Sequence, residues 1–349
     1  MTGGIVRILS FPAGYPWFWS SSAAFLAGVG GAWAVARWGA GLGLVALPTS
    51  RGSHTHPTPT GGGIGLVLAL AGLMLWRGIP LFVWLPGVLL ALVSLLGDRH
   101  HLTPAFRLAM QCGAAAATLH GLGIEGLLGA AFPPESRYGV LHYALLLLYM
   151  VASANFYNFM DGINGLAGSS GALAFGLLAL YAAFHGKALF FVELSAVMAG
   201  GCLGFLPFNV PRARVFMGDV GSILLGFMFA TVVVGIAATI GEFFLLVGFL
   251  FPLYTDVLIT LGERLGIRQP LLQPHRCHLY QILVNERGVP HWQVTAGYGV
   301  LQVVIAGMLW GLAGRVRNSV PVALFFLFFC FWWVSRRVKA RTADVWVST

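Results

Sequence analysis

Long apolar stretches separated by short polar connections run along almost the whole chain. A stretch of about 20 apolar residues is enough for a helix to cross a bilayer. By this measure we predict spans at roughly residues 15–36, 61–77, 80–97, 105–123, 139–157, 165–184, 188–208, 220–240, 243–262, 294–313 and 319–335. These spans leave no room for a sizeable soluble domain. The pattern therefore predicts an all-α integral membrane protein, in which residues 1–349 form one domain, a bundle of about ten or eleven transmembrane helices.

The composition and the placement of charge agree with this prediction. The chain is 58% hydrophobic and 9% charged, whereas a soluble domain carries about 25% charged residues. When the loops are assigned alternately to the two sides, fourteen of the 20 Lys and Arg residues fall on the side that holds the C-terminus. The positive-inside rule then places the C-terminus in the cytoplasm and the N-terminus outside. Because this topology accounts for the net charge of +9, we expect no nucleic acid as a partner.

The segment 155–168, NFYNFMDGINGLAG, carries the densest group of polar side chains near the apolar spans. Asn155, Asn158, Asp161 and Asn164 recur every three residues, so on a helix they would form a slowly drifting stripe. Amides and carboxylates in or beside a bilayer are costly to desolvate, and they therefore usually line a site or a cavity. The alternative is that the asparagines only join neighbouring helices. We favour a site, because four polar residues occur together with two glycines.

Further polar segments fall on the same predicted cytoplasmic side. The segment 51–65 is a glycine-rich loop that leads into a helix and suits an anion, although it also fits a plain connector. In 97–107, Asp98 lies at a helix end, which is equally typical of a solvated turn. Asp219 precedes a long span and could serve only as an N-cap. The connection 263–292 holds arginines and histidines, of which the positive-inside rule explains only the arginines.

Together these groups indicate phosphoryl transfer at the cytoplasmic face. Carboxylate and amide oxygens suit Mg²⁺, with Mn²⁺ as the alternative, and such ions complete their shell with water and substrate phosphates. Arginine and histidine neutralise a phosphate leaving group. The crowded His275, Cys277 and His278 do not suit a tetrahedral zinc site. The residues therefore predict a membrane enzyme that acts on a phosphorylated, nucleotide-linked substrate.

Four motifs then resemble one family. NFYNFMDGINGLAG, FMGDVGS at 216–222, SHTHPTPTGGG at 53–63 and PHRCHLYQIL at 274–283 are similar to motifs of the polyprenyl-phosphate N-acetylhexosamine-1-phosphate transferases, glycosyltransferase family 4. They follow the family's order within residues 37–292, and the HRCHLYQ form resembles the bacterial O-antigen-initiating branch. The resemblance implies an enzyme of the bacterial inner membrane that uses Mg²⁺. Its implied reaction joins a UDP-amino sugar to undecaprenyl phosphate as a sugar-1-phosphate, releases UMP and starts a lipid-linked surface glycan. A homodimer is a further expectation of the family.

The resemblance also implies a role for individual residues. Asn158 and Asp219 match the positions that coordinate Mg²⁺, and Asp161 and Asn164 match the nucleotide-binding end of the asparagine motif. The implied catalytic residues are Asp98, Asp161 and Asp219, and the implied substrate-binding residues are Asn155, Asn164, Phe216 (near the uracil), His275, Arg276 and His278 (at the diphosphate and sugar), His54 and Arg51.

Three positions depart from the family pattern. Gly97 stands where the first of two adjacent aspartates is usual, Thr60 replaces an arginine, and Ala46 replaces an aspartate. A lipid phosphate has a second pKa near 6 and is largely ionised at neutral pH, so an enzyme without the first aspartate is chemically reasonable. The alternatives are a catalytically degenerate family member and a transporter or flippase for polyprenyl-phosphate lipids. The sequence leaves the donor sugar, the glycan pathway and the oligomeric state open.

Overall fold

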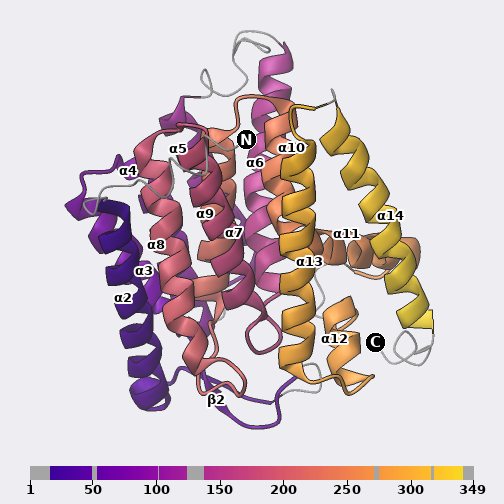
Figure 1. The fold of residues 1–349 in the computed structure, drawn as a ribbon. Helices are drawn as coiled ribbons and strands as arrows, with labels where there is room; N and C mark the ends of the chain where they lie inside the picture. The colour runs from indigo at the N-terminus through magenta and orange to yellow at the C-terminus, as the bar shows by residue number, and fades with distance from the viewer. Residues whose placement is uncertain are drawn as a thin grey trace.

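The chain folds into a bundle of helices (Figure 1), as a computed structural model shows for residues 16–48, 53–100, 102–123, 137–270, 275–315 and 318–340. The helices are α2 Pro16–Trp38, α3 Ile64–Trp76, α4 Leu81–His100, α5 Pro104–Leu122, α6 Arg137–Phe159, α7 Leu166–Phe184, α8 Leu189–Phe205, α9 Asp219–Ile236, α10 Ile240–Val247, α11 Phe251–Gly266, α12 Leu279–Asn285, α13 His291–Leu312 and α14 Ser319–Ala340. Two short strands, β1 Val45–Ala46 and β2 Thr58–Pro59, pair antiparallel with Val45 opposite Pro59. The all-α membrane fold is confirmed.

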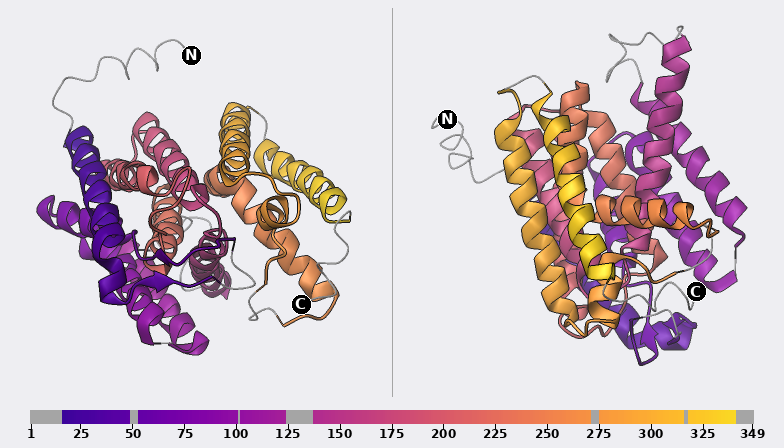
Figure 2. Two further views of the ribbon diagram at one scale, coloured as in Figure 1. Left: turned by 90° about the horizontal axis from the view of Figure 1, so that it is seen from below. Right: turned by 90° about the vertical axis from the view of Figure 1, so that its right-hand side faces the viewer.

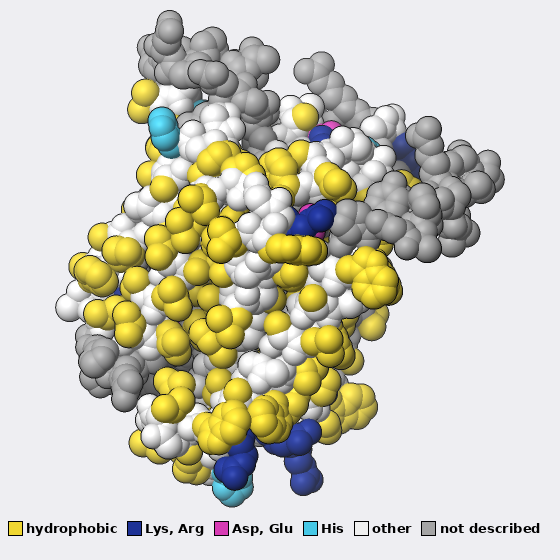
Figure 3. Space-filling view, turned by 90° about the vertical axis from the view of Figure 1, so that its left-hand side faces the viewer, with side chains coloured by type: hydrophobic (Ala, Val, Ile, Leu, Met, Phe, Trp, Pro, Cys, Tyr) yellow, Lys and Arg dark blue, Asp and Glu magenta, His cyan; other side chains and the backbone are white. Residues whose placement is uncertain are grey.

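The helices have the length and composition of a multi-pass membrane protein. Within the described residues, seven segments are long and apolar enough to cross a membrane, and Ile64–Trp76 and Leu81–Gly97 are apolar but shorter. Helices α2 and α5 occupy the two remaining predicted spans. Apolar side chains cover most of the face shown in Figure 3. A soluble monomer exposes far less apolar surface than this. Such a surface suits contact with lipid.

The position of each helix in the bundle follows from how much of it is buried. In α9, 89% of the residues are buried, whereas in the most apolar 18-residue stretch of α14 only 11% are buried. Helix α9 is therefore central, and it packs against α4, α6 and α7. Helix α14 lies at the edge of the bundle (Figures 1 and 2) and presents most of its surface to the surroundings.

The ninth predicted span, 243–262, falls within one apolar segment long enough to cross a membrane, Ile240–Gly266, but this segment is not one straight helix. Helix α10 ends at Val247, a short 3₁₀ turn covers Gly248–Leu250, and α11 then begins at Phe251. Figure 2 shows that α11 runs across the bundle instead of along it. Pro252 lies in the first turn of α11, where its missing N–H costs nothing but where a continuous helix would lose a hydrogen bond. The ninth span thus consists of a short helix and a crosswise one.

Candidate active site

The N-terminus of α9 brings together residues from three helices. Asp219, the first residue of α9, accepts a hydrogen bond from Arg107 of α5, whose Nη1 lies 2.8 Å from Asp219 Oδ2. Asn158 of α6 donates from Nδ2 to Asp219 Oδ1 at 2.8 Å and lies 2.9 Å from Ser222 Oγ. The sequence did not predict Arg107 as a partner of Asp219. These contacts define a cluster, Arg107–Asn158–Asp219, at one end of the bundle.

The donor set of this cluster fits a magnesium ion. The amide oxygen and nitrogen of Asn158 share one carbon, so the amide oxygen lies within about 5.5 Å of Asp219 Oδ1. The two amide atoms are interchanged by a simple flip of the side chain. Mg²⁺ takes one or two carboxylates and fills its shell with waters and phosphates. No group of three or more His, Cys, Asp or Glu suited to a metal occurs among the described residues. A site of two protein oxygens therefore fits Mg²⁺ better than zinc.

Asp161 follows the end of α6 and interacts electrostatically with the Asp219 carboxylate. Burial, and then the nearby Asp219 carboxylate, raise the pKa of Asp161 well above its ordinary value. Loss of hydration and the second negative charge nearby both disfavour the ionised form of Asp161. A cation bound at Asp219 would reverse that effect and favour the ionised form.

The two glycine-rich motifs lie against each other. Phe216 N donates to Pro59 O at 2.8 Å, and Gly62 N donates to Phe216 O at 2.9 Å. A Cβ on Gly63 would lie 2.4 Å from Gly221 Cα, so a glycine is needed for this approach. The rings of His54 and Phe216 meet edge to face at 4.9 Å. The motifs 53–63 and 216–222 thus form one surface beside Asp219.

Buried polar atoms without a partner occur at this same surface. Within the described part of the chain, Ser53 Oγ, His54 Nε2 and Arg107 Nε are buried and make no hydrogen bond. A buried polar atom that makes no hydrogen bond costs about 1–3 kcal/mol. A phosphate-bearing ligand would satisfy such donors.

The segment 275–282 reaches the asparagine motif through Tyr280. Its hydroxyl donates to Phe159 O at 2.9 Å, and a Cβ on Gly162 would lie 2.2 Å from that hydroxyl oxygen. His278 stacks on Phe159 with ring centroids 6.5 Å apart. The glycine after Asp161 is therefore required by the approach of Tyr280, and the two motifs form neighbouring walls.

Asp256 of α11 holds this segment in place, and sequence reasoning missed it. The carboxylate is fully buried and accepts hydrogen bonds from Leu279 N at 2.8 Å, Tyr280 N at 3.3 Å and the Tyr298 hydroxyl at 2.7 Å. His278 Nδ1 lies 3.7 Å away. A carboxylate in an otherwise apolar predicted span was the signal that could have found Asp256.

His275 and Arg276 begin the described part of this segment. Burial, and then the positive surroundings that include His278, lower the pKa of His275 to about 3. The imidazole is therefore neutral near pH 7 and would donate a hydrogen bond to a phosphate without adding charge. Arg276 Nη2 lies 3.5 Å from Glu286 Oε1.

Two predicted substrate-binding asparagines are engaged within the protein. Asn155 Nδ2 donates to Gln111 Oε1 at 2.7 Å, and Gln111 Nε2 returns a bond to Asn155 Oδ1 at 3.3 Å. Asn164 Nδ2 donates to Pro211 O at 3.2 Å, and its backbone is held by His291 and Thr295. Asn155 therefore joins α5 to α6, and Asn164 fixes the loop before α7. Both substrate-binding roles stay predictions.

The remaining predictions concern residues at the start of the motifs. Arg51 lies outside the described residues, and for Asp98 only the backbone, in α4, is described. At the neighbouring Gly97, an added Cβ would lie 3.0 Å from Arg107 Nη2. The position of the missing family aspartate thus faces the guanidinium that pairs with Asp219.

The chain is similar to a known family and to several known proteins. The family described as Glycosyl transferase family 4 matches residues 80–237. A Bacillus subtilis (strain 168) protein, "Probable undecaprenyl-phosphate N-acetylglucosaminyl 1-phosphate transferase", is 25% identical over 247 residues, 69% of this chain and 67% of the relative. A Mycobacterium tuberculosis (strain H37Rv) protein, "Decaprenyl-phosphate N-acetylglucosaminephosphotransferase", is 28% identical over 325 residues, 82% of this chain and 77% of the relative. A Nostoc punctiforme "Phospho-N-acetylmuramoyl-pentapeptide-transferase" is 32% identical over 211 residues, 59% of this chain and 57% of the relative.

The apolar helices and these relatives together indicate a membrane-embedded transferase. Over residues 80–237 the chain is similar to glycosyl transferase family 4, and over longer stretches it is similar to these phosphotransferases; it is an enzyme.

Proposed function

We propose that the protein transfers an N-acetylhexosamine-1-phosphate, or a related amino-sugar-1-phosphate, from a UDP-sugar to undecaprenyl phosphate. Relatives named for transfer to undecaprenyl phosphate and decaprenyl phosphate support the acceptor class. The observation that carries the proposal is the Arg107–Asn158–Asp219 cluster, which lies beside a glycine-rich surface with unpaired buried donors. In this reaction an oxygen of the lipid phosphate attacks the sugar-bearing phosphorus, the diphosphate P–O bond breaks, and UMP leaves.

We propose Mg²⁺ as the cofactor, with Mn²⁺ as the alternative ion. Asp219 and Asn158 would hold it, in keeping with their adjacent oxygens. The bound ion would neutralise diphosphate charge.

The protein's own residues account for the rest of the mechanism. Arg107 can neutralise phosphate charge, because its Nη1 pairs with Asp219 while its Nε has no partner among the described residues. His54 Nε2 is a further free donor beside Phe216. The acceptor phosphate is largely a dianion at neutral pH, so the attack requires no protein base at position 97.

The direct test is a donor panel. Membranes that contain the protein are supplied with Mg²⁺, undecaprenyl phosphate and labelled UDP-sugars, including a UDP-linked N-acetylated 6-deoxyhexosamine. We expect an organic-extractable diphosphate lipid and an equal amount of UMP from at least one donor. Membranes with Asp219→Ala serve as the control. The proposal fails if no UDP-amino sugar in the panel yields UMP.

The structure offers little support for a transporter. Glu193, the carboxylate nearest to the middle of a predicted span, is buried at the opposite end of the bundle from Asp219. It lies 2.8 Å from Arg77 Nε and accepts a hydrogen bond from Ser20 at 2.6 Å. A carboxylate that is paired in this way serves packing. Release of UMP would also distinguish the two functions, because a transporter releases none.

A further inference from the structure

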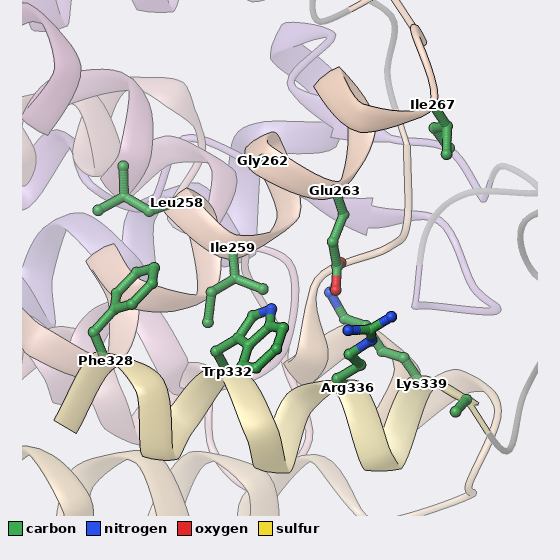
Figure 4. Close-up of a pocket in the computed structure, with 10 residues that line it drawn as sticks. Leu258, Ile259, Gly262, Glu263, Ile267, Phe328, Trp332, Arg336 and Lys339 are labelled. Carbon is green, nitrogen blue, oxygen red and sulfur yellow. The ribbon is translucent and has the colours of Figure 1, made fainter. Parts of the chain in front are cut away.

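A groove separates the crosswise helix α11 from the peripheral helix α14. Its volume is about 660 Å³. Figure 4 shows side chains of both helices directed into this space. Leu258 and Ile259 of α11 and Phe328 and Trp332 of α14 line its apolar part. Only 11% of the most apolar 18-residue stretch of α14 is buried, so α14 faces lipid. The groove beside it therefore also lies where lipid surrounds the protein.

The groove changes character towards the end of α14. Arg336 and Lys339 line it there together with Glu263 of α11. Lys339 Nζ lies 2.7 Å from Glu263 Oε2 and 3.2 Å from Thr260 Oγ1. Arg336 is exposed and forms no ion pair within the described residues, so the basic end keeps a net positive charge.

Two adjacent tryptophans of α14 are each followed by an arginine four residues later. The Arg336 guanidinium lies 5.4 Å from the ring of Trp332, and the Arg337 guanidinium lies 5.1 Å from the ring of Trp333. Trp followed by Arg near a helix end is typical of the boundary between lipid tails and head groups. The apolar part of the groove thus lies at tail depth, and its basic end lies at head-group depth.

We propose that this groove binds one phospholipid with an anionic head group. An acyl chain lies along Leu258, Phe328 and Trp332, and the head-group phosphate contacts Arg336 beside Lys339. The charge of the groove's end selects an anionic lipid over a zwitterionic one. Positive-inside topology explains a basic helix end, but it does not explain why Arg336 faces a groove while Arg337 does not.

The groove is connected to the candidate active site through α11. Lys339 contacts Thr260, Thr260 Oγ1 donates to Asp256 Oδ1 at 3.4 Å, and Asp256 holds the backbone of Leu279 and Tyr280. A lipid that fills the space between α11 and α14 therefore also steadies the segment 275–282. We expect a bound lipid to raise the melting temperature and to slow amide exchange at 279–281.

Lipid binding by the purified full-length protein tests this inference without any need for catalysis. The delipidated protein in neutral detergent is titrated with dioleoyl phosphatidylglycerol, and native mass spectrometry counts the lipid retained. We expect one tightly retained molecule, and at least tenfold weaker binding of dioleoyl phosphatidylcholine. Arg336→Ala should weaken phosphatidylglycerol binding about fivefold. Arg337→Ala is the matched control and should bind like the unaltered protein.

A second variant blocks the apolar part of the groove. Leu258 is 47% exposed, so Leu258→Trp can fill the groove without entering the core, and its melting temperature in lipid-free detergent checks the fold. It should abolish the retained molecule. Equal binding of phosphatidylcholine, equal losses in Arg336→Ala and Arg337→Ala, or retention of undecaprenyl phosphate alone would each overturn the proposal.

Discussion

Asp219 divides its two carboxylate oxygens between a cation and an amide. Oδ2 lies 2.8 Å from Arg107 Nη1, and Oδ1 lies 2.8 Å from Asn158 Nδ2. The ion pair is about one-third exposed on both sides, so it contributes little to folding stability. Its importance is chemical, because Arg107 and a magnesium ion would compete for the same carboxylate.

Substitutions at Asp219 and Asn158 should show separately how the charge and the shape of the cluster affect activity. Asp219→Asn keeps the shape but removes the charge that opposes Mg²⁺, and it should lower turnover by about three orders of magnitude or more. Asn158→Ala should raise the Mg²⁺ concentration needed for half-maximal activity. The measurement is UMP release against Mg²⁺ concentration, with Glu242→Gln at the opposite end of the bundle as the control. Near-normal turnover of Asp219→Asn at low Mg²⁺ would contradict the assignment of Asp219 as a Mg²⁺ ligand.

Gly97→Asp tests the competition for Arg107. A Cβ at position 97 would meet Arg107 at 3.0 Å, and a carboxylate there would draw the flexible guanidinium away from Asp219. We expect the Mg²⁺ concentration for half-maximal activity to fall about threefold, because Asp219 loses a competing cation worth about 0.6 kcal/mol. Gly97→Asn adds similar volume without charge and should leave this concentration unchanged. Identical Mg²⁺ curves for the Asp and Asn variants would contradict the prediction.

His275 should make the folded protein sensitive to acid. Its pKa is lowered from 6.5 to about 3 by burial and nearby positive charge. Between these values the unfolded chain binds a proton at His275 that the folded chain does not, so the free energy of unfolding falls as pH drops through this window. His275→Gln should therefore lose less in melting temperature between pH 7 and pH 5, by about 2 °C after allowance for partial exposure. His56→Gln, at an exposed histidine, should lose as much as the unaltered protein.

At the scale of elements, Asp256 links three helices. Its carboxylate on α11 accepts backbone hydrogen bonds from the start of α12 and a hydroxyl bond from Tyr298 on α13. Asp256→Asn replaces one acceptor oxygen by a donor that faces N–H groups, which leaves buried groups unpaired and costs about 2 kcal/mol or more.

The expected consequence is a loose segment 275–282. Asp256→Asn should speed amide exchange at Leu279 and Tyr280 and raise the KM for the UDP-sugar more than it lowers kcat. Glu242→Gln, at the opposite end of the bundle and paired with Lys187, should leave those two amides protected. Unchanged protection in Asp256→Asn would show that Asp256 does not hold the segment.

The elements were predictable wherever local pattern decides them. Ten of the predicted spans correspond to helices of the structure, because a continuous apolar run of sufficient length forms one helix in lipid. The ninth span also falls within one apolar segment, but its bend between α10 and α11 was not predictable, because Pro252 and the buried Asp256 do not interrupt the apolar run. The sequence likewise placed Asn158 and Asp219 on one face. It did not reveal Arg107 or Asp256 as contacts, since Arg107 lies 112 residues from Asp219 and Asp256 lies 23 residues from Leu279.

At the scale of the whole molecule, the motifs gather at one end of the bundle. The ends of α6 and α8 and the starts of α7, α9 and α13 meet there, and the C-terminal end of α14 lies on the same side (Figure 1). The predicted orientation would place this end in the cytoplasm.

Reporter fusions test the orientation. A green fluorescent protein joined to the C-terminus should fluoresce, because it folds in the cytoplasm. The same reporter joined after Gly314, at the far end of α13, should stay dark. A bright fusion at Gly314 together with a dark C-terminal fusion would invert the topology and remove the candidate site from the compartment that supplies nucleotide sugars.

The bend between α10 and α11 also has a consequence for the order of synthesis. Residues 240–266 form one apolar segment of 27 residues, and they leave the ribosome before any of the groups that hold Asp256 from α12 and α13. Leu279 and Tyr280 follow 23 and 24 residues later, and Tyr298 follows 42 residues later. The membrane insertion machinery therefore meets a largely apolar stretch in which the Asp256 carboxylate does not yet have these hydrogen-bond partners. The crosswise helix, and with it the wall of the active site, takes shape only when nearly the entire polypeptide has been made.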